Sequence, residues 1–262
     1  MIDLHYYEEK SESAAAAAAF GARAIKRAID ERGRANVVVA TGASQLEMLE
    51  ALVMHDEVSW RHVTGFHLDE YVGLPPTHRA SFRRYLRERF TERLPALGGF
   101  HFIEGDAPDC DAEIARLNQL LDRHPIDVTL AGIGENGHLA FNDPPADFTS
   151  TAAFKRVTLD RTCRLQQLGE GWFATLDEVP MDAISMTIQR IMTSRTVVLT
   201  VPDARKATAV REVLEGPVTN LWPASILQQH GACHLFLDRA AASKLTRRPD
   251  PARVPITDQG RV

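Results

Sequence analysis

Short apolar runs typical of buried β-strands alternate with helical patterns along most of this chain. Asn36–Ala40 (NVVVA) and Thr196–Val201 (TVVLTV) are rich in β-branched residues, as strands covered on both faces usually are. A loop and a helical pattern follow each of them. This repeated order predicts an α/β fold, with a mostly parallel sheet and helices on both faces.

The remaining elements are predicted from the same patterns. Further strands are expected at Ile2–Tyr7, Val63–Leu68, Phe100–Ile103, Asp127–Ile133, Phe154–Leu159 and His234–Leu237. Helices are expected at Ser11–Glu31, Leu46–Val53, Ser81–Arg93 and Asp111–Asp122, between Asp203 and Gly216, and from Trp222. Residues 160–190 show only short helical stretches around Leu165, Leu168, Ile184, Met186 and Ile188.

The expected organisation is one domain over residues 1–243. The segment around residues 146–190 is expected to cover the functional site. The end of the chain, residues 244–262, is rich in proline and arginine and is expected to be a flexible tail.

Composition argues against several classes of protein. With 262 residues, 44% of them apolar, the chain can bury a substantial core. Its net charge of −5 argues against nucleic-acid binding. The three cysteines are widely spaced and form no C-x-x-C pair, which favours a reducing, cytoplasmic compartment and suggests no metal site. The sequence contains no apolar run of about 18 residues and no secretory-type N-terminus, so we expect no membrane association.

The segment Ala131–Asp143 (AGIGENGHLAFND) is the strongest candidate for a functional site. It follows the predicted strand and contains three glycines within six residues, which permit a sharp turn and a close approach to a ligand. His138, Asn142 and Asp143 can exchange protons or form hydrogen bonds. The alternative is a tight turn that the histidine only caps.

A second candidate is the loop Thr41-Gly42-Ala43-Ser44, between a predicted strand and a predicted helix. Ser44 and Glu47 fit a capping box. The free N–H groups of a helix N-terminus also bind anions, so the loop is equally a candidate phosphate site. It is neither a Walker motif nor a G-x-G-x-x-G dinucleotide motif.

Charged residues follow two other predicted strands. Asp69 and Glu70 stand at a strand end, where ligand clefts of α/β proteins form, although a solvated turn is the alternative. Lys206 falls in the first turn of a helix, where a bound anion would offset its repulsion from the helix dipole. Both a phosphate contact and a solvent-exposed lysine remain open. Arg164, taken by itself, is expected to be solvated.

The arginines of the predicted helix Ser81–Arg93 form either a phosphate or nucleic-acid patch or a solvated face. Glu88, Glu92 and the net acidity of the chain favour the solvated face.

Four segments in order carry a resemblance: ATGAS, FHLDEYVGLP, GIGENGHLAFNDP and VPDARKA. They resemble the glucosamine-6-phosphate deaminase/isomerase family, within a wider group that includes 6-phosphogluconolactonases. The resemblance covers roughly residues 30–240. It implies a Rossmann-like fold and conversion of an amino-sugar 6-phosphate to a ketose 6-phosphate and ammonia. No cofactor or metal is implied, and the expected partner is this small molecule. A homo-oligomer is compatible with the resemblance, because relatives range from monomers to hexamers.

The resemblance also implies roles for individual residues. Asp69 would be the base that moves a proton between C2 and C1, and His138 would open the sugar ring with Asp143 in its relay. The phosphate would be held by Thr41, Gly42, Ala43, Ser44, Arg164 and Lys206.

Two departures from the family pattern concern the substrate. Asn136 stands where the family has a carboxylate two residues before the histidine, and Asp143 replaces a glutamate. The relay then has one carboxylate in place of two, so His138 gains less support for its charged form. A weaker deaminase and an enzyme for another amino sugar, such as galactosamine 6-phosphate, both fit this difference.

Two alternative functions belong to other classes. A 6-phosphogluconolactonase would resemble S-L-F-P after the histidine, where this chain has F-N-D-P. A non-catalytic sugar-phosphate sensor would normally carry a DNA-binding helix-turn-helix, for which this sequence has no spare N-terminal segment, and it retains Asp69 and His138.

Overall fold

The computed structural model describes residues 2–246, and a seven-stranded parallel sheet is its centre. The strand order is β1-β10-β9-β6-β2-β3-β5. The strands are β1 (Ile2–Tyr6), β2 (Ala35–Val39), β3 (Val63–His67), β5 (Gly99–His101), β6 (Val128–Ala131), β9 (Thr196–Val201) and β10 (Cys233–Leu237). The prediction of a Rossmann-like, mostly parallel sheet is confirmed.

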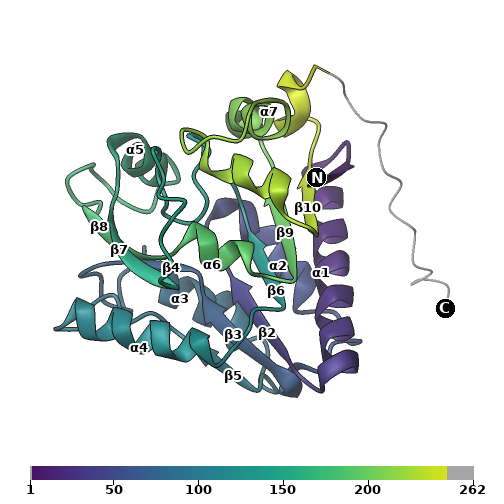
Figure 1. Ribbon diagram of the computed structural model, residues 1–262, viewed down its shortest axis with the longest axis vertical. Helices are drawn as coiled ribbons and strands as arrows, with labels where there is room; N and C mark the ends of the chain where they lie inside the picture. Colours follow the sequence, from purple (N-terminus) through teal and green to yellow (C-terminus); the bar gives the residue numbers. More distant parts are fainter. Residues whose placement is uncertain (1, 247–262) are drawn as a thin grey trace.

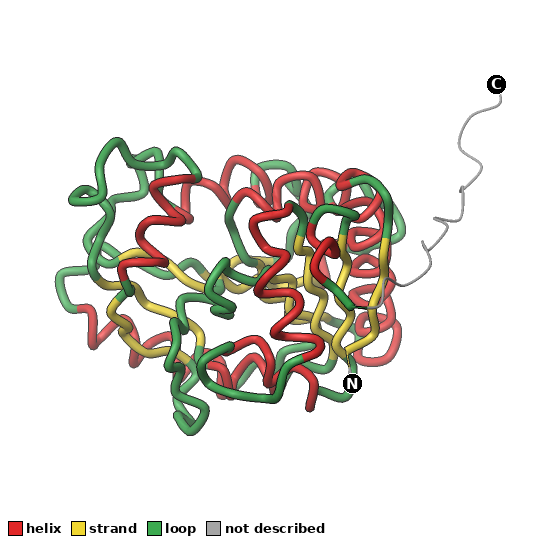
Figure 2. Tube along the Cα trace, turned by 90° about the horizontal axis from the view of Figure 1, so that it is seen from above, coloured by secondary structure: helices red, strands yellow, loops and turns green. Residues whose placement is uncertain are grey.

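Helices cover both faces of this sheet (Figures 1 and 2). The helices of the described residues are α1 (Lys10–Arg32), α2 (Leu46–Leu52), α3 (Phe82–Leu86), α4 (Cys110–Asp122), α5 (Arg161–Gly169), α6 (Ile188–Met192) and α7 (Ala207–Glu215). Among them, α5 packs with the cluster that contains residues of β4 and β8. Short 3₁₀ segments lie at Ala43–Gln45, Trp60–His62, Ala204–Lys206, Pro223–Gln229 and Ala241–Lys244, and a π-helical turn spans Arg87–Thr91.

Alternate residues of the central strands enter different cores. Val37 and Val39 of β2 pack with α1 and α2, whereas Val38 packs in the core on the opposite face. Because side chains of a strand point alternately to the two faces, a strand covered on both sides must be apolar throughout. This explains the uninterrupted run Asn36–Ala40.

A second, antiparallel sheet lies beside the first, in the order β4-β8-β7 (Figure 1). It is formed by β4 (Asp69–Tyr71), β7 (Phe154–Thr158) and β8 (Asp182–Met186). The prediction of helix around Ile184 and Met186 is wrong, because these residues pair with β4 and β7. A short apolar run does not distinguish strand from helix by its spacing, and here the tertiary pairing decides.

Two predicted helix starts also differ in the structure. Ser44 forms no capping box: it lies inside the 3₁₀ turn, and its Oγ accepts from Nε2 of Gln45 at 3.0 Å. Asp203 precedes its helix but does not cap it through its side chain. Its backbone is in the left-handed region, with φ of 81°, and its N–H donates to the carboxylate of Asp238.

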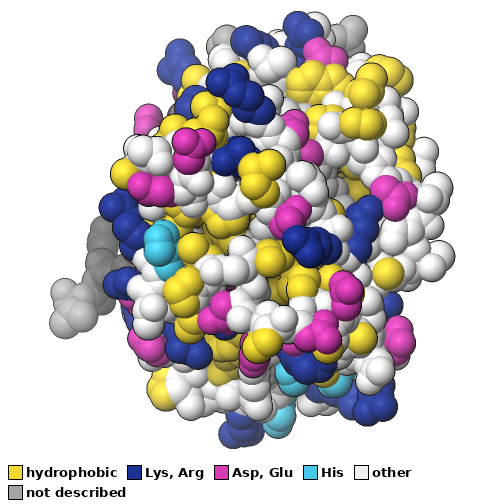
Figure 3. Space-filling view, turned by 90° about the vertical axis from the view of Figure 1, so that its left-hand side faces the viewer, with side chains coloured by type: hydrophobic (Ala, Val, Ile, Leu, Met, Phe, Trp, Pro, Cys, Tyr) yellow, Lys and Arg dark blue, Asp and Glu magenta, His cyan; other side chains and the backbone are white. Residues whose placement is uncertain are grey.

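The arginines of the predicted helix Ser81–Arg93 divide into two groups. Arg84 and Arg89 pair with Glu88 at 2.7 and 3.3 Å, as a solvated face predicts. Arg83 is instead buried, and its guanidinium donates to Asp106 at 2.6 Å. The side of the molecule that bears β7, β8 and α5 likewise shows basic and acidic side chains interspersed (Figure 3), and Arg156 pairs there with Asp182.

Within residues 2–246, no helix is long and apolar enough to cross a membrane. Residues 247–262 of the predicted tail lie outside the described residues. The assignment of residues 1–243 to one domain stays a prediction.

Candidate active site

The carboxyl ends of the central parallel strands border an open cleft. Its walls come mainly from residues 40–44 after β2, 68–69 after β3, 132–140 after β6, 202–206 after β9, and 166–170 at the end of α5. The chain runs outward from β2 to β3 and β5, then returns to β6 on the other side of β2. Ligand clefts of α/β sheets form where the strand order reverses in this way.

The loop after β2 forms one end of the cleft. Thr41, Gly42, Ala43 and Ser44 all line it. Gly42 has φ of 99°, a conformation that favours glycine, and its carbonyl accepts from the hydroxyl of Tyr85 at 3.0 Å. The loop is therefore held in a bent conformation with its backbone facing the cleft.

Lys206 lines the same cleft from the turn after β9. Its side chain is 6% exposed, and no carboxylate among the described residues lies within ion-pair distance of it. Burial lowers the pKa of Lys206, although the charges of Glu170 and Glu135 act in the opposite direction. A buried cation of this kind is suited to bind an anionic group of a ligand.

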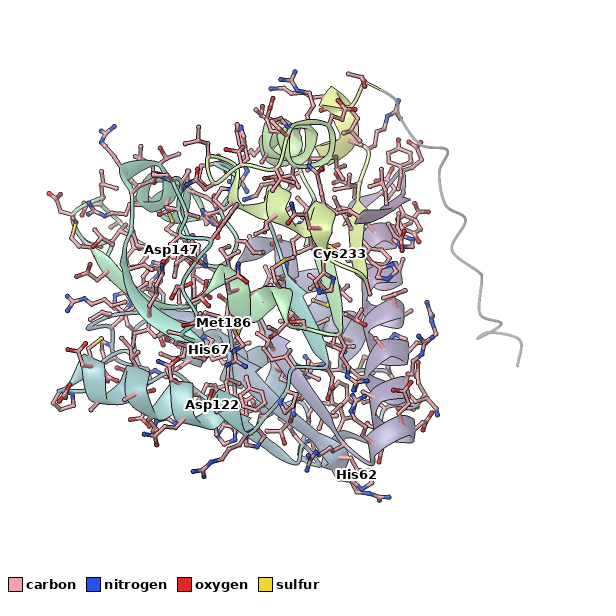
Figure 4. The ribbon with its side chains drawn as sticks, viewed as in Figure 1. His62, His67, Asp122, Asp147, Met186 and Cys233 are labelled. Atoms are coloured by element: carbon pink, nitrogen blue, oxygen red, sulfur yellow. The ribbon has the colours of Figure 1, made fainter. Side chains whose placement is uncertain are left out.

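Asp69 is positioned by both sheets. The N–H of Leu68 donates to Val39 of β2, and the N–H of Met186 in β8 donates to the carbonyl of Leu68 at 3.0 Å. Figure 4 shows this junction, with His67 and Met186 in the middle of the molecule. Asp69 itself is 6% exposed and lines the cleft.

Burial raises the pKa of Asp69 to about 8, and the adjacent charge of Glu70 adds to this shift. A carboxyl group with a pKa in this range can accept and return a proton near neutral pH. The geometry and the protonation of Asp69 both suit a general base.

Glu70 turns away from the cleft. Its carboxylate accepts hydrogen bonds from the N–H groups of Tyr71, Phe82 and Arg83 and from the hydroxyl of Ser81. It therefore caps the start of α3. Of the two adjacent acids that follow β3, only Asp69 lines the cleft.

His138 stands on the loop after β6 and forms another wall of the cleft. Its Nδ1 lies 3.1 Å from Oδ1 of Asp143. The imidazole packs against Gly134, where a Cβ atom would come within 2.3 Å of the ring. Only glycine leaves room for this ring, which explains one of the glycines in the segment.

Asn136 and Asp143 lie behind His138. Asn136 donates from Nδ2 to Asp143 at 3.0 Å and accepts from the N–H of His138 at 3.1 Å. Burial alone would raise the pKa of Asp143, but contacts from His138, Asn136 and the N–H of Asp160 outweigh it and lower the pKa. Asn136 therefore helps to keep Asp143 ionised beside His138.

Arg164 is a predicted site residue that the structure places neither in the cleft wall nor in contact with His138. Its guanidinium donates to the carbonyl oxygens of Leu176 and Val179 at 2.6 and 3.0 Å. These contacts tie α5 to the following loop, so the geometry gives a phosphate contact no support.

The sequence reasoning missed Arg205 and Glu170. Both line the cleft, and Arg205 pairs with Glu135 at 3.5 Å. The position of Arg205 directly before Lys206 was an available signal. No sequence signal pointed to Glu170, because it reaches the cleft only through the packing of α5, which depends on tertiary structure.

Within residues 2–246, one group of side chains could hold a metal ion. Donor atoms of His138, Asp143 and Cys163 all lie within 4.8 Å of one another. Their spacing in the sequence, 5 and 20 residues, follows no common metal motif.

Comparisons with known proteins agree with this architecture. The family described as glucosamine-6-phosphate isomerases/6-phosphogluconolactonase matches residues 8–235. A glucosamine-6-phosphate deaminase of Exiguobacterium sp. is 39% identical over 206 residues, covering 79% of this chain and 79% of the relative. Another from Streptococcus equi subsp. equi is 37% identical over 214 residues, covering 82% and 89%.

Solved structures give a corresponding result. A monomeric glucosamine-6-phosphate deaminase superposes with a TM-score of 0.83 and 32% identity, covering 92% of this chain and 99% of the other. A 6-phosphogluconolactonase assigned to Neisseria gonorrhoeae has a TM-score of 0.73 and 24% identity, covering 91% and 100%. At 24% identity, the similarity to the 6-phosphogluconolactonase structure shows a shared fold only.

Proposed function

Since this chain belongs to the family of glucosamine-6-phosphate isomerases and 6-phosphogluconolactonases, we propose that it is an amino-sugar phosphate deaminase. It converts glucosamine 6-phosphate, or a close epimer, to a ketose 6-phosphate and ammonia. The observation that carries this proposal is the placement of Asp69, His138 and Lys206 around one cleft. The similarity to deaminases at 37 to 39% identity supports the same reaction.

The phosphate occupies the end of the cleft bordered by the loop 41–44 and Lys206. The bent backbone at Gly42 offers N–H groups, and Lys206 supplies positive charge from a largely buried position. Arg205, which also lines the cleft, adds a second cation near this end. Binding the phosphate here directs the sugar carbons toward Asp69 and His138.

The reaction begins with ring opening. His138 takes the proton of the C1 hydroxyl and returns a proton to the ring oxygen, which leaves an open-chain aldehyde. Asp143 stabilises the imidazolium through its 3.1 Å contact with Nδ1.

Isomerisation and deamination follow. Asp69 removes the C2 proton while the C1 oxygen gains a proton from water, which gives an enolamine. Asp69 then delivers its proton to C1, which produces a protonated imine at C2. Water then adds to the imine carbon and ammonia departs, leaving the ketose. The raised pKa of Asp69 matches a group that must both accept and donate this proton.

An ammonia assay tests the proposal. Purified protein is incubated with glucosamine 6-phosphate and, in parallel, with galactosamine 6-phosphate, and ammonia is measured. Release from either substrate supports the deaminase, and the faster one identifies the epimer. Hydrolysis of 6-phosphogluconolactone without ammonia release would replace the proposal with a lactonase. If sugar phosphates raise the melting temperature without any turnover, the protein is a sensor.

The proposal also includes a cytoplasmic location and assembly into a homo-oligomer. Sedimentation equilibrium with and without substrate measures the oligomeric state directly.

A further inference from the structure

Cys163 is a buried thiol to which the proposed mechanism assigns no role. It lies in the first turn of α5 and is 1% exposed. Its backbone N–H donates to the carboxylate of Asp160 at 2.6 Å, and the N–H of Asp160 donates in turn to Asp143 at 2.9 Å. These two bonds fix the start of α5 against Asp143, and so they hold the thiol close to it.

The thiol, the Asp143 carboxylate and the His138 imidazole converge from two separate segments of the chain. Their donor atoms all lie within 4.8 Å of one another. Ligands of a tetrahedral Zn²⁺ at bond lengths of about 2.0–2.3 Å stand closer together than this, so binding requires the side chains to draw inward. A sulfur, a nitrogen and an oxygen donor favour Zn²⁺ or Co²⁺ over Mg²⁺ or Ca²⁺, which take oxygen ligands.

We propose that His138, Asp143 and Cys163 form a binding site for Zn²⁺ that inhibits the enzyme. Three protein ligands leave a fourth tetrahedral position for water. Binding through sulfur releases the thiol proton, and binding through Nδ1 requires the neutral imidazole with its proton on Nε2.

The inhibition follows from this change at the imidazole. Nδ1 already faces Asp143, and the opposite edge of the ring packs against Gly134 in the cleft wall. With metal on Nδ1 and a proton on Nε2, the ring has no lone pair left to accept a proton from a sugar hydroxyl. The Asp143 carboxylate, when it binds the metal, also no longer stabilises the imidazolium form of His138. This consequence rests on the proposed deaminase function, whereas metal binding itself does not.

Cobalt spectroscopy tests the binding independently of activity. Addition of Co²⁺ to the metal-free, full-length protein is expected to produce the intense visible bands of tetrahedral Co²⁺ and a thiolate-to-cobalt charge-transfer band. The Cys163→Ser variant should lose the charge-transfer band. Cys233→Ser is the matched control, because Cys233 is also buried but lies at the start of β10 (labelled in Figure 4), whereas the cleft lies at the carboxyl ends of the strands.

The cobalt spectra can contradict the proposed metal site in three ways. Absence of both bands in the wild-type protein overturns the site, as does a charge-transfer band that persists in Cys163→Ser or disappears in Cys233→Ser. Serine keeps a hydroxyl donor toward Asp143, and circular dichroism verifies that the variant folds. If it does not fold, Cys163→Ala provides the same comparison.

An activity measurement tests the inhibition. Zn²⁺ should abolish ammonia release by the wild-type protein, and a chelator should restore it. Cys163→Ser should turn over normally without metal and require at least about tenfold more Zn²⁺ for half inhibition, in line with the loss of one ligand. Equal sensitivity of the two proteins would overturn the inhibitory role. If the wild type shows the cobalt bands but has no deaminase activity, the metal site stands and the proposed function fails.

Discussion

Asp69 and Glu70 are adjacent in the chain, yet their carboxylates meet opposite surroundings. Glu70 accepts four hydrogen bonds from the start of α3 and from its neighbour Tyr71, whereas Asp69 faces the cleft. Successive residues of a strand point to opposite sides, which separates the two groups. One carboxylate therefore anchors a helix, and the other lines the cleft, where the proposed mechanism uses it for proton transfer.

Replacing Asp69 with asparagine should abolish catalysis while leaving phosphate binding intact. Asparagine has nearly the same shape but cannot accept the C2 proton, and general bases contribute about 10²–10⁴-fold to rates. Steady-state ammonia release measures the loss, and a melting-temperature shift with substrate measures the binding. A variant that keeps most of its turnover would remove Asp69 from the role of base.

The pH dependence of kcat/KM should show an ascending limb near pH 8. The base acts in its ionised form, and burial raises the pKa of Asp69 to about 8, so activity rises as the pH increases through that value. Glu70→Gln removes the neighbouring negative charge that contributes to this shift, and the limb should move to lower pH. An unchanged limb in a folded Glu70→Gln protein would show that another group controls it.

At the scale of elements, the cleft is assembled from loops that follow different strands. Residues 41–44, Asp69, His138 and Lys206 come from the loops after β2, β3, β6 and β9, and parallel strands bring their carboxyl ends to one edge of the sheet. The end of α5 closes the cleft from the side of the second sheet. The same helix contributes Cys163 to the proposed metal site.

Lys206→Ala and Arg164→Ala should have different effects. Loss of Lys206 removes a charged phosphate contact of about 1.5–3 kcal/mol, so KM should rise at least about tenfold with a smaller change in kcat. Arg164→Ala should leave KM near the wild-type value and lower the melting temperature, because Arg164 binds the carbonyl oxygens of Leu176 and Val179. A large increase of KM in Arg164→Ala would restore the phosphate role that the resemblance implied.

At the scale of the whole molecule, the alanine-rich segment of α1 determines how closely this helix approaches the sheet. Ala14, Ala17, Ala18 and Ala22 are buried in the core shared with α2 and the central strands. Small side chains on this face leave room for Leu49, Leu52 and other large residues, and a close-packed core tolerates little added volume.

Ala17→Leu should therefore destabilise the protein by about 1–3 kcal/mol through overpacking. Ala15→Leu is the control, because Ala15 lies on the exposed face of the same helix. Urea unfolding measures both variants, and ammonia release under native conditions should remain near the wild-type level in each. Equal stability of the two variants would contradict the close packing described for Ala17.

The sequence alone was sufficient for those features that depend on local pattern and order along the chain. Uninterrupted β-branched runs predicted strands buried on both faces, and their alternation with helices predicted the parallel sheet. Taken one by one, the loops at the strand ends left structural and functional interpretations open. The resemblance of four segments to the deaminase/isomerase family then placed Thr41–Ser44, Asp69, His138 and Lys206 in one expected site.

Tertiary structure alone decided which side chains meet across the cleft. Strand β8 forms because β4 and β7 pair with it. Arg164 of α5 binds carbonyl oxygens of the loop that follows the helix, and Cys163 reaches Asp143 through the packing of α5. Residues far apart in sequence become neighbours through packing that no local pattern encodes. For that reason the sequence, through the resemblance of its segments, predicted which residues line the cleft, while the partners of those residues emerged only from the folded chain.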